Sequence, residues 1–181
     1  MWLNAYSEYK GLEPVYYRGN IVWKDYTSTS GSFSWNQTKN GYRLPTECEW
    51  EFAAGGGSEE EHDKYIYAGS NTIDDVAWYS GNSRNEVHKV GTKKANKLGL
   101  YDMSGNIYER VFDYYYYWGT GELTNPVHWS GDGRIYRGGN IDNAYYYCSI
   151  TYRKHFDLAS SITQDSWSDR SIGIRIARNA E

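Results

Sequence analysis

The spacing of apolar and polar positions along the chain predicts short helices and short strands joined by long polar segments. Residues 2–10 are predicted to form a short helix that Gly11 ends. The clearest signal covers residues 46–54, where Thr46 and Glu49 have the spacing of a capping box before an apolar face. Three consecutive glycines would end this second helix.

The remaining pattern predicts strands and loops. Residues 86–90, 134–137 and 172–177 are predicted strands, and the last has isoleucine at every second position, the period of a half-buried strand. Residues 26–41, rich in Ser, Thr, Asn and Gly, and the charged residues 58–64 are predicted loops. Because no repeat or linker divides the chain, we expect one compact α+β domain.

The composition adds an unusual content of tyrosine and tryptophan. Aromatic residues make up 18% of the chain, with 20 Tyr and 8 Trp against 4 Phe. Tyr and Trp have an apolar body and a polar tip, which suits half-wet surfaces. If the runs at 114–118 and 145–147 are extended, neighbouring side chains alternate, so at least one ring of each run faces solvent. Clustered exposed aromatics indicate an interaction site.

Charge and cysteine usage exclude several classes. The net charge of −4, without a basic patch, argues against a nucleic-acid partner. No apolar run of about 18 residues could span a membrane, and the N-terminus carries no signal-peptide pattern. Cys48 and Cys148 form neither a disulfide framework nor a CxxC site, so both are expected to be small buried residues. The four histidines have no ligand-like spacing.

Four motifs occur in a specific order. They are Tyr-Arg-Leu-Pro-Thr-Glu-Cys-Glu-Trp-Glu at 42–51, Gly-Leu-Tyr-Asp-Met-Ser-Gly-Asn-Ile-Tyr-Glu at 99–109, Arg-Gly-Gly-Asn at 137–140 and Ile-Gly-Ile-Arg at 172–175. Together they resemble the formylglycine-generating enzyme (sulfatase-modifying factor) family. The resemblance implies a single C-type lectin-like domain over residues 1–181, with short helices, short antiparallel strands and extensive loops. It also implies that the sequence begins inside the family domain.

The sequence departs from the enzymes of this family. Tyr108 and Arg110 stand where members usually have Trp, and Ile174 replaces a customary Phe. The oxidising enzymes use two cysteines, five residues apart, to bind copper(I), whose preferred ligands are soft thiolates. The matching positions are Asn143 and Cys148. We therefore expect no copper and no catalysis, and an oxidoreductase with a degenerate site that uses Cys148 alone remains an alternative.

The resemblance also implies a calcium site. In the family, residues matching Asp102, Gly105, Ile107 and Glu109 surround Ca²⁺. Two carboxylates and two backbone carbonyls are suitable hard oxygen ligands. The alternative is a turn in which Asp102 accepts hydrogen bonds from backbone amides.

Other proteins that this chain resembles are the variable proteins of diversity-generating retroelements, in which adenines of a template are mutated. Most residues of segment 140–171 can be reached from an Asn codon by changing adenines, although Lys154, Gln164 and Trp167 cannot. Tyr, Ser and Asn also dominate antibody paratopes. The predicted ligand-binding residues are Asn140, Asp142, Asn143, Tyr145, Tyr146, Tyr147, Ser149, Tyr152, His155, Phe156, Asp157, Ser168, Asp169 and Ser171.

One exposed patch for a protein or glycan ligand is predicted from ten of them, which are Tyr145, Tyr146, Tyr147, Ser149, Tyr152, His155, Phe156, Asp157, Ser168 and Asp169. The resemblance implies display on a virion or on an extracellular cell surface. A non-diversified member of the family with a binding or structural role is the second reading. The residues leave the ligand and the oligomeric state open.

Overall fold

The computed structural model describes residues 1–24, 32–117, 123–157 and 172–179, with the side chains of residues 156 and 157 left out of the description. The chain forms two compact units. The first combines Met1–Pro45 with Ile176–Glu181, and the second is Thr46–Arg175. That residues 1–181 are a single domain stays a prediction.

The first unit is a small antiparallel sheet with one helix. Its elements are α1 (Trp2–Tyr9), β1 (Tyr16–Arg18), β2 (Ile21–Val22) and β3 (Phe33–Trp35), and the strand order is β2-β1-β3. The buried Asn4 side chain ties α1 to β1, because its amide group both donates to and accepts from the backbone of Tyr16. Gly11, with a φ of +72°, follows the end of this helix, as the sequence predicts.

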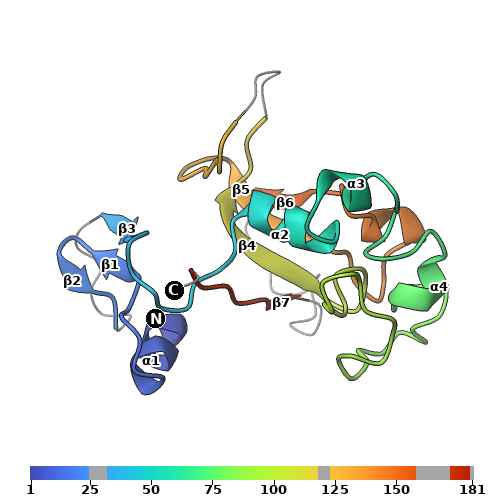
Figure 1. Ribbon diagram of the computed structural model, residues 1–181, viewed down its shortest axis with the longest axis horizontal. Helices are drawn as coiled ribbons and strands as arrows, with labels where there is room; N and C mark the ends of the chain where they lie inside the picture. The colour runs from blue at the N-terminus through green and yellow to red at the C-terminus, as the bar shows by residue number, and fades with distance from the viewer. Residues whose placement is uncertain (25–31, 118–122, 158–171, 180–181) are drawn as a thin grey trace. The chain divides into compact units, whose positions relative to one another are not determined.

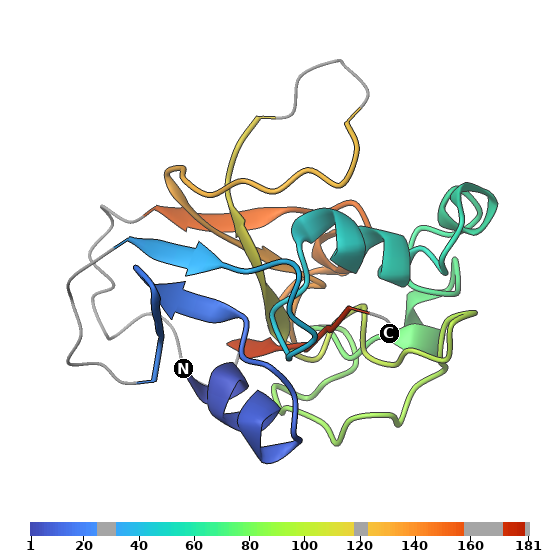
Figure 2. The same cartoon turned by 60° about the vertical axis from the view of Figure 1, so that its left-hand side comes forward.

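The second unit contains a four-stranded mixed sheet in the order β6-β5-β4-β7 (Figure 1). Its elements are α2 (Glu47–Ala54), α3 (Glu59–His62), α4 (Ile73–Val76), β4 (Tyr108–Tyr114), β5 (Gly133–Arg137), the 3-10 helix η1 (Tyr145–Cys148), β6 (Lys154–Asp157) and β7 (Ile172–Ile174). Residues 77–107, green to yellow-green in Figure 2, connect α4 to β4 without a helix or strand. The α+β class with short elements is confirmed.

Helix α2 supplies the centre of this unit's core. Both hydrogen bonds of the predicted capping box are present, since Thr46 accepts from the Glu49 amide and the Glu49 carboxylate accepts from the Thr46 amide. Trp50 is 1% exposed and packs with residues of the sheet, including Val111 and Ile135. Its indole N–H donates to the buried Glu109 carboxylate at 2.7 Å. The fold therefore fixes α2 against β4 and β5.

Three element predictions were wrong. Residues 86–90 form no strand, because the backbone of His88 bonds to the Asn106 side chain instead of to a neighbouring strand. The predicted loop 26–41 contains β3, while residues 25–31 lie outside the described part. The predicted loop 58–64 contains α3, whose N-terminus is capped by the Ser58 hydroxyl.

Strand β7 pairs parallel to β4, whereas the resemblance implies antiparallel strands. Its isoleucines lie on the exposed side, with Ile172 and Ile174 at 37% and 49% exposure. Gly173 lies on the opposite side, where a Cβ atom would be 2.3 Å from the Ile107 side chain. The alternation is therefore real, but the small residue faces inward.

None of the helices within the described ranges is long and apolar enough to cross a membrane.

Candidate ligand-binding surface

Four tyrosines of the predicted segment pack side by side, and we call Tyr145, Tyr146, Tyr147 and Tyr152 the tyrosine surface. Ring centroids are 5.5 Å apart for Tyr145 and Tyr146, 4.3 Å for Tyr146 and Tyr147, and 4.8 Å for Tyr147 and Tyr152. Tyr145 and Tyr146 are 57% and 51% exposed. The run 145–147 is a 3-10 helix rather than an extended strand, and two of its three rings face solvent.

The backbone that carries these rings is anchored at both ends. Before η1, the Asn143 carbonyl accepts the amide of Ser80 at 3.0 Å. After η1, the amide of Ile150 donates to the carbonyl of Ile66 at 2.9 Å, and Ile150 itself is buried in the core. The exposed rings are therefore displayed by a fixed backbone, which reduces the entropy lost when a ligand orders them.

Buried tyrosines that the sequence analysis did not select lie close to this surface. Tyr108, on β4, is 1% exposed, and its burial together with the nearby Tyr152 and Tyr147 raises its pKa. Burial also raises the pKa of Tyr67, which is close enough to Tyr145 and Tyr79 to feel their charges. Tyr108 stands where family members usually have Trp, but nothing in the sequence indicates that it lies near Tyr147 and Tyr152.

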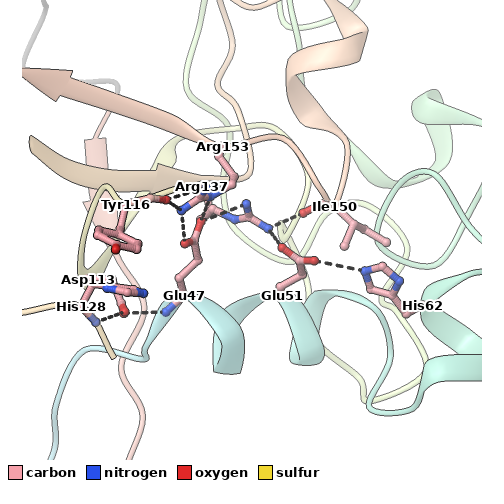
Figure 3. A network of polar contacts seen from close by, with 9 residues as sticks. All are labelled: Glu47, Glu51, His62, Asp113, Tyr116, His128, Arg137, Ile150 and Arg153. Atoms are coloured by element: carbon pink, nitrogen blue, oxygen red, sulfur yellow. Dashed lines mark hydrogen bonds and ion pairs between the residues drawn. The ribbon is translucent and has the colours of Figure 1, made fainter. Parts of the chain in front are cut away.

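An ion network connects the segment to helix α2 (Figure 3). Arg137, fully buried on β5, donates to Glu47 at 3.2 Å, to Glu51, and to the carbonyl of Ile150 at 2.7 Å. Arg153, next to Tyr152 in the chain, donates to both oxygens of Glu47 at 2.7 and 2.8 Å. Burial opposes it, but the hydrogen bonds and charge of Glu47 raise the pKa of Arg153. The network therefore holds the segment 150–153 at both ends, through the Ile150 carbonyl and through the side chain of Arg153.

A second group of aromatic side chains follows β4. Arg153 also donates to the carbonyl of Tyr116, whose ring stacks on His128 at 4.3 Å (Figure 3). His155 stacks on Tyr115 at 3.8 Å. Tyr116 and Tyr117 are exposed, so the prediction that the run 114–118 places a ring in solvent is confirmed for its described part.

The other predicted ligand-binding residues have different positions. Asp142 is exposed, and Asn143 and Ser149 are half-buried. Asn140 is 2% exposed and accepts the amide of Asp142, so its side chain shapes the turn, and its role in ligand binding stays a prediction. Phe156 and Asp157 belong to β6 by their backbone. Ser168, Asp169 and Ser171 lie outside the described residues.

The positions that match the family's two cysteines form no thiol pair. The Asn143 side chain accepts the amide of Asn140 at 3.1 Å, and thereby closes the turn before η1. Cys148 is fully buried, and burial raises the pKa of its thiol to about 12. A reactive cysteine needs exposure and a lowered pKa, and Cys148 has neither. Cys48 is half-buried, and burial raises its pKa to about 11.

The predicted calcium ligands differ in how well they suit a cation. Asp102 accepts the amide of Gly91 at 2.7 Å through Oδ2, whereas its buried Oδ1 has no hydrogen-bond partner. Both oxygens of Glu109 are engaged, because Arg175 donates to each and Trp50 donates to Oε2. The described residues hold no group of three or more His, Cys, Asp or Glu side chains arranged for a metal. Asp102 therefore has one carboxylate oxygen without a hydrogen-bond partner, whereas both oxygens of Glu109 are paired with Arg175.

The chain matches the sulfatase-modifying factor enzyme 1-like domain over residues 4–180. It is 34% identical over 200 residues to the chaperone protein LppX of Paenibacillus barcinonensis, which covers 98% of this chain and 65% of that protein. It is 31% identical over 172 residues to the formylglycine-generating enzyme of Streptomyces coelicolor, covering 82% of this chain and 52% of the enzyme. The fold is similar to Treponema denticola variable protein 1, with a TM-score of 0.78, 30% identity and coverage of 98% and 66% of the two chains.

These similarities agree with the α+β architecture and with the ordered motifs. The chain belongs to the sulfatase-modifying factor enzyme 1-like family. It spans slightly less than two thirds of LppX and of variable protein 1, and about half of the Streptomyces enzyme.

Proposed function

We propose that this chain is a non-catalytic ligand-binding protein and that the tyrosine surface contacts the ligand. The observation that carries the proposal is the exposure of Tyr145 and Tyr146 on a turn whose flanking backbone is anchored in the core. Rigid tyrosines supply a large contact area at low entropy cost. Similarity to a protein named variable protein 1 supports the same interpretation. So does the segment 140–171, because most of its residues can be reached from an Asn codon by changing adenines.

The proposal includes the absence of catalysis of the family's oxidative kind. It is supported by Asn143, which cannot supply a thiolate, and by the burial and raised pKa of Cys148. The chemistry of a thiolate nucleophile or copper(I) ligand requires a deprotonated sulfur. We therefore propose that this chain shares the fold of formylglycine-generating enzymes but not their reaction.

A binding screen tests the proposal. The wild-type chain and the double variant Tyr145→Ser/Tyr146→Ser are probed against a glycan array and an array of cell-surface protein ectodomains. We expect at least one ligand of the wild type whose affinity falls roughly 10- to 100-fold in the double variant, since aromatic anchors dominate interface energies. The wild type and the double variant should melt at nearly the same temperature, because the side chains of Tyr145 and Tyr146 are exposed.

Tyr9→Ser is the matched control, since Tyr9 is 80% exposed on α1, in the other unit. Its binding should equal that of the wild type. A ligand whose affinity is unchanged in the double variant would place the binding site elsewhere. Absence of any ligand in both arrays would contradict a role in attachment to surfaces.

The proposal extends to diversification of residues 140–171 and to display on a virion or cell surface. Sequencing near-identical copies of the gene tests the first part. We expect substitutions at adenine-containing codons of Tyr145, Tyr146, Tyr147 and Tyr152, beside an adenine-rich template. We expect no substitutions at Cys148, Ile150 and Arg153. The first two are buried in the core and Arg153 is paired with Glu47, so these residues form the frame that supports the exposed rings. Identical copies would leave a binding protein without diversification.

We also propose that a calcium ion binds next to Asp102. The unpartnered buried Oδ1 supports it, because a buried carboxylate oxygen without a partner is costly. Saturating Ca²⁺ should raise the melting temperature of chelator-treated protein by about 5–10 °C, the effect of a ligand at roughly 100 times its Kd. Asp102→Asn should abolish the rise and the exposed Asp132→Asn should keep it. No heat of binding and no shift in calorimetry would refute the proposal.

A further inference from the structure

The sheet of the first unit, β2-β1-β3 (Figure 1), has one buried face and one face that carries a cleft. Cross-strand partners point to the same side of a sheet, and neighbours along a strand point to opposite sides. Tyr16 and Trp35, a cross-strand pair of β1 and β3, are 5% and 9% exposed. Tyr17 and Ser34, the next pair, therefore lie on the opposite face, where they line a cleft of about 480 Å³.

The cleft is hollow because two of its positions have no large side chain. Ser34 stands directly opposite Tyr17, so the small side chain leaves room beside the half-buried ring. Gly19 also lines the cleft, and a Cβ atom built on it would meet nothing within 4 Å. Trp35 contributes to the lining, but it is buried, and Arg43 lies 4.7 Å from its ring centre. Tyr17 therefore supplies the aromatic ring that a ligand in the cleft would meet.

The rest of the lining consists of three residues with side-chain amides. Asn20 and Gln37 are exposed, and within the described part of the chain their side chains make no hydrogen bond. The Asn36 side-chain oxygen accepts the amide and the hydroxyl of Thr38 at 3.0 and 2.8 Å, which leaves the Asn36 NH₂ group as a donor. Asn179 donates to the Gln37 carbonyl at 2.7 Å and so holds the backbone beside the cleft.

The described residues that line the cleft carry no charge. Lys39 lies close to Tyr17, but it forms an ion pair with Glu13, and Glu13 more than Tyr17 raises the pKa of Lys39. A charged ligand would lose hydration in the cleft without meeting an unpaired opposite charge, whereas a hydroxyl group needs only a hydrogen-bond partner. The cleft therefore favours a polar ligand without net charge.

We infer that this cleft binds a neutral mono- or disaccharide, with the Tyr17 ring against one face of the sugar and the amides of Asn36 and Gln37 at its hydroxyl groups. A sugar hydroxyl both donates and accepts hydrogen bonds, as a side-chain amide does. The C–H groups of a sugar ring match the negative face of an aromatic ring. The volume lies within the range of small-molecule sites. This site belongs to the first unit and goes beyond the function proposed for the tyrosine surface, which belongs to the second.

Binding of small sugars to the full chain tests the inference. The probes are glucose, galactose, mannose, N-acetylglucosamine, maltose, cellobiose and lactose, followed by saturation-transfer NMR and by calorimetry. We expect at least one of them to bind saturably with a Kd on the order of 1 mM, because an open cleft offers few contacts against the entropy cost of binding. Glucuronate and galacturonate should bind at least about tenfold more weakly than the best neutral sugar, because their carboxylates find no partner.

Variants of the lining locate the bound sugar. Tyr17→Leu removes the ring and Ser34→Leu fills the space opposite it, so each should weaken binding at least about tenfold. Ser34→Ala keeps that space and should bind within about threefold of the wild type. Gln37→Ala should weaken binding by about three- to tenfold, the loss of one hydrogen bond, without affecting the fold, because Gln37 is exposed. Tyr9→Ser, at an exposed position of α1 in the same unit, should have no effect.

The outcomes distinguish this site from the tyrosine surface. The double variant Tyr145→Ser/Tyr146→Ser should bind the sugar as the wild type does. No saturable binding of any probe, equal affinity for the uronic acids, or binding that survives both Tyr17→Leu and Ser34→Leu overturns the inference. If sugar binding depends on Tyr145 and Tyr146 instead, the proposed function stands and the inference about the cleft fails. If it depends on Tyr17 and Ser34 while no ligand depends on the tyrosine surface, the inference stands and the proposed function fails.

Discussion

Replacing Glu47 by alanine is expected to lower the free energy of unfolding by about 3–5 kcal/mol, because it removes one of the two carboxylates paired with the buried Arg137 and the carboxylate paired with Arg153. Glu47 is 2% exposed and accepts hydrogen bonds from Arg137 and Arg153. Arg137 is fully buried, and burial already lowers its pKa against the opposing effect of Glu51 and Glu47. In the variant, Arg137 keeps Glu51 and the Ile150 carbonyl but loses its second carboxylate.

Denaturant unfolding followed by tryptophan fluorescence measures this loss. Glu60→Ala is the control, since Glu60 is exposed on the short helix α3 and its removal should change stability by no more than about 0.5 kcal/mol. Glu47→Ala should also loosen the tyrosine surface, because Arg153, next to Tyr152 in the chain, would lose both of its bonds to Glu47. A cost below about 1 kcal/mol would mean that water replaces Glu47 and that the network does not fix the segment.

Local signals in the sequence were sufficient for part of the fold. The capping box of Thr46 and Glu49 depends on four consecutive residues, so it could be predicted before the tertiary structure was known. The same holds for α1 and for β5. The face of β7 could not be predicted, because it depends on Ile107 occupying the space next to Gly173, and these residues are 66 positions apart. Parallel pairing with β4 is likewise a non-local choice.

The candidate surface shows the same division. The local argument for the run 145–147 assumed an extended strand and required at least one ring in solvent. The run is a 3-10 helix, in which Tyr145 and Tyr146 are the exposed rings. Asn140 was included because of its codon, and only the fold shows that its side chain closes a buried turn. Arg153 was overlooked because its role depends on Glu47, 106 residues earlier. The frame beneath a surface is made of non-local contacts, so sequence patterns reveal the displayed side chains more readily than their support.

Within residues 145–153, exposed residues and residues that support the backbone occur at neighbouring positions. Tyr145 and Tyr146 are exposed, Cys148 and Ile150 are buried, and Arg153 pairs with Glu47. Such alternation lets the exposed positions change while the buried ones keep the backbone in place. It also means that tolerance to substitution is decided by the close contacts under η1.

Gly139→Ala is expected to show how little room there is at these contacts. Gly139 has a φ of +73°, a backbone conformation that disfavours a side chain by about 1 kcal/mol. A Cβ atom there would be 2.8 Å from the Cys148 sulfur and 2.8 Å from the Tyr147 carbonyl oxygen. Overpacking typically costs a further 1–3 kcal/mol, so we expect a total loss of about 2–4 kcal/mol in denaturant unfolding.

Gly99→Ala separates the two terms, because Gly99 has a similar φ of +76° and no atom within 4 Å of a built Cβ. It should cost only the backbone term, about 1 kcal/mol. The excess cost of Gly139→Ala then measures the contact with η1, and ligand affinity should fall with it because Tyr147 and its neighbours must move. Equal costs at the two glycines would show that η1 yields freely, and a yielding turn could not display Tyr145 and Tyr146 in a fixed orientation.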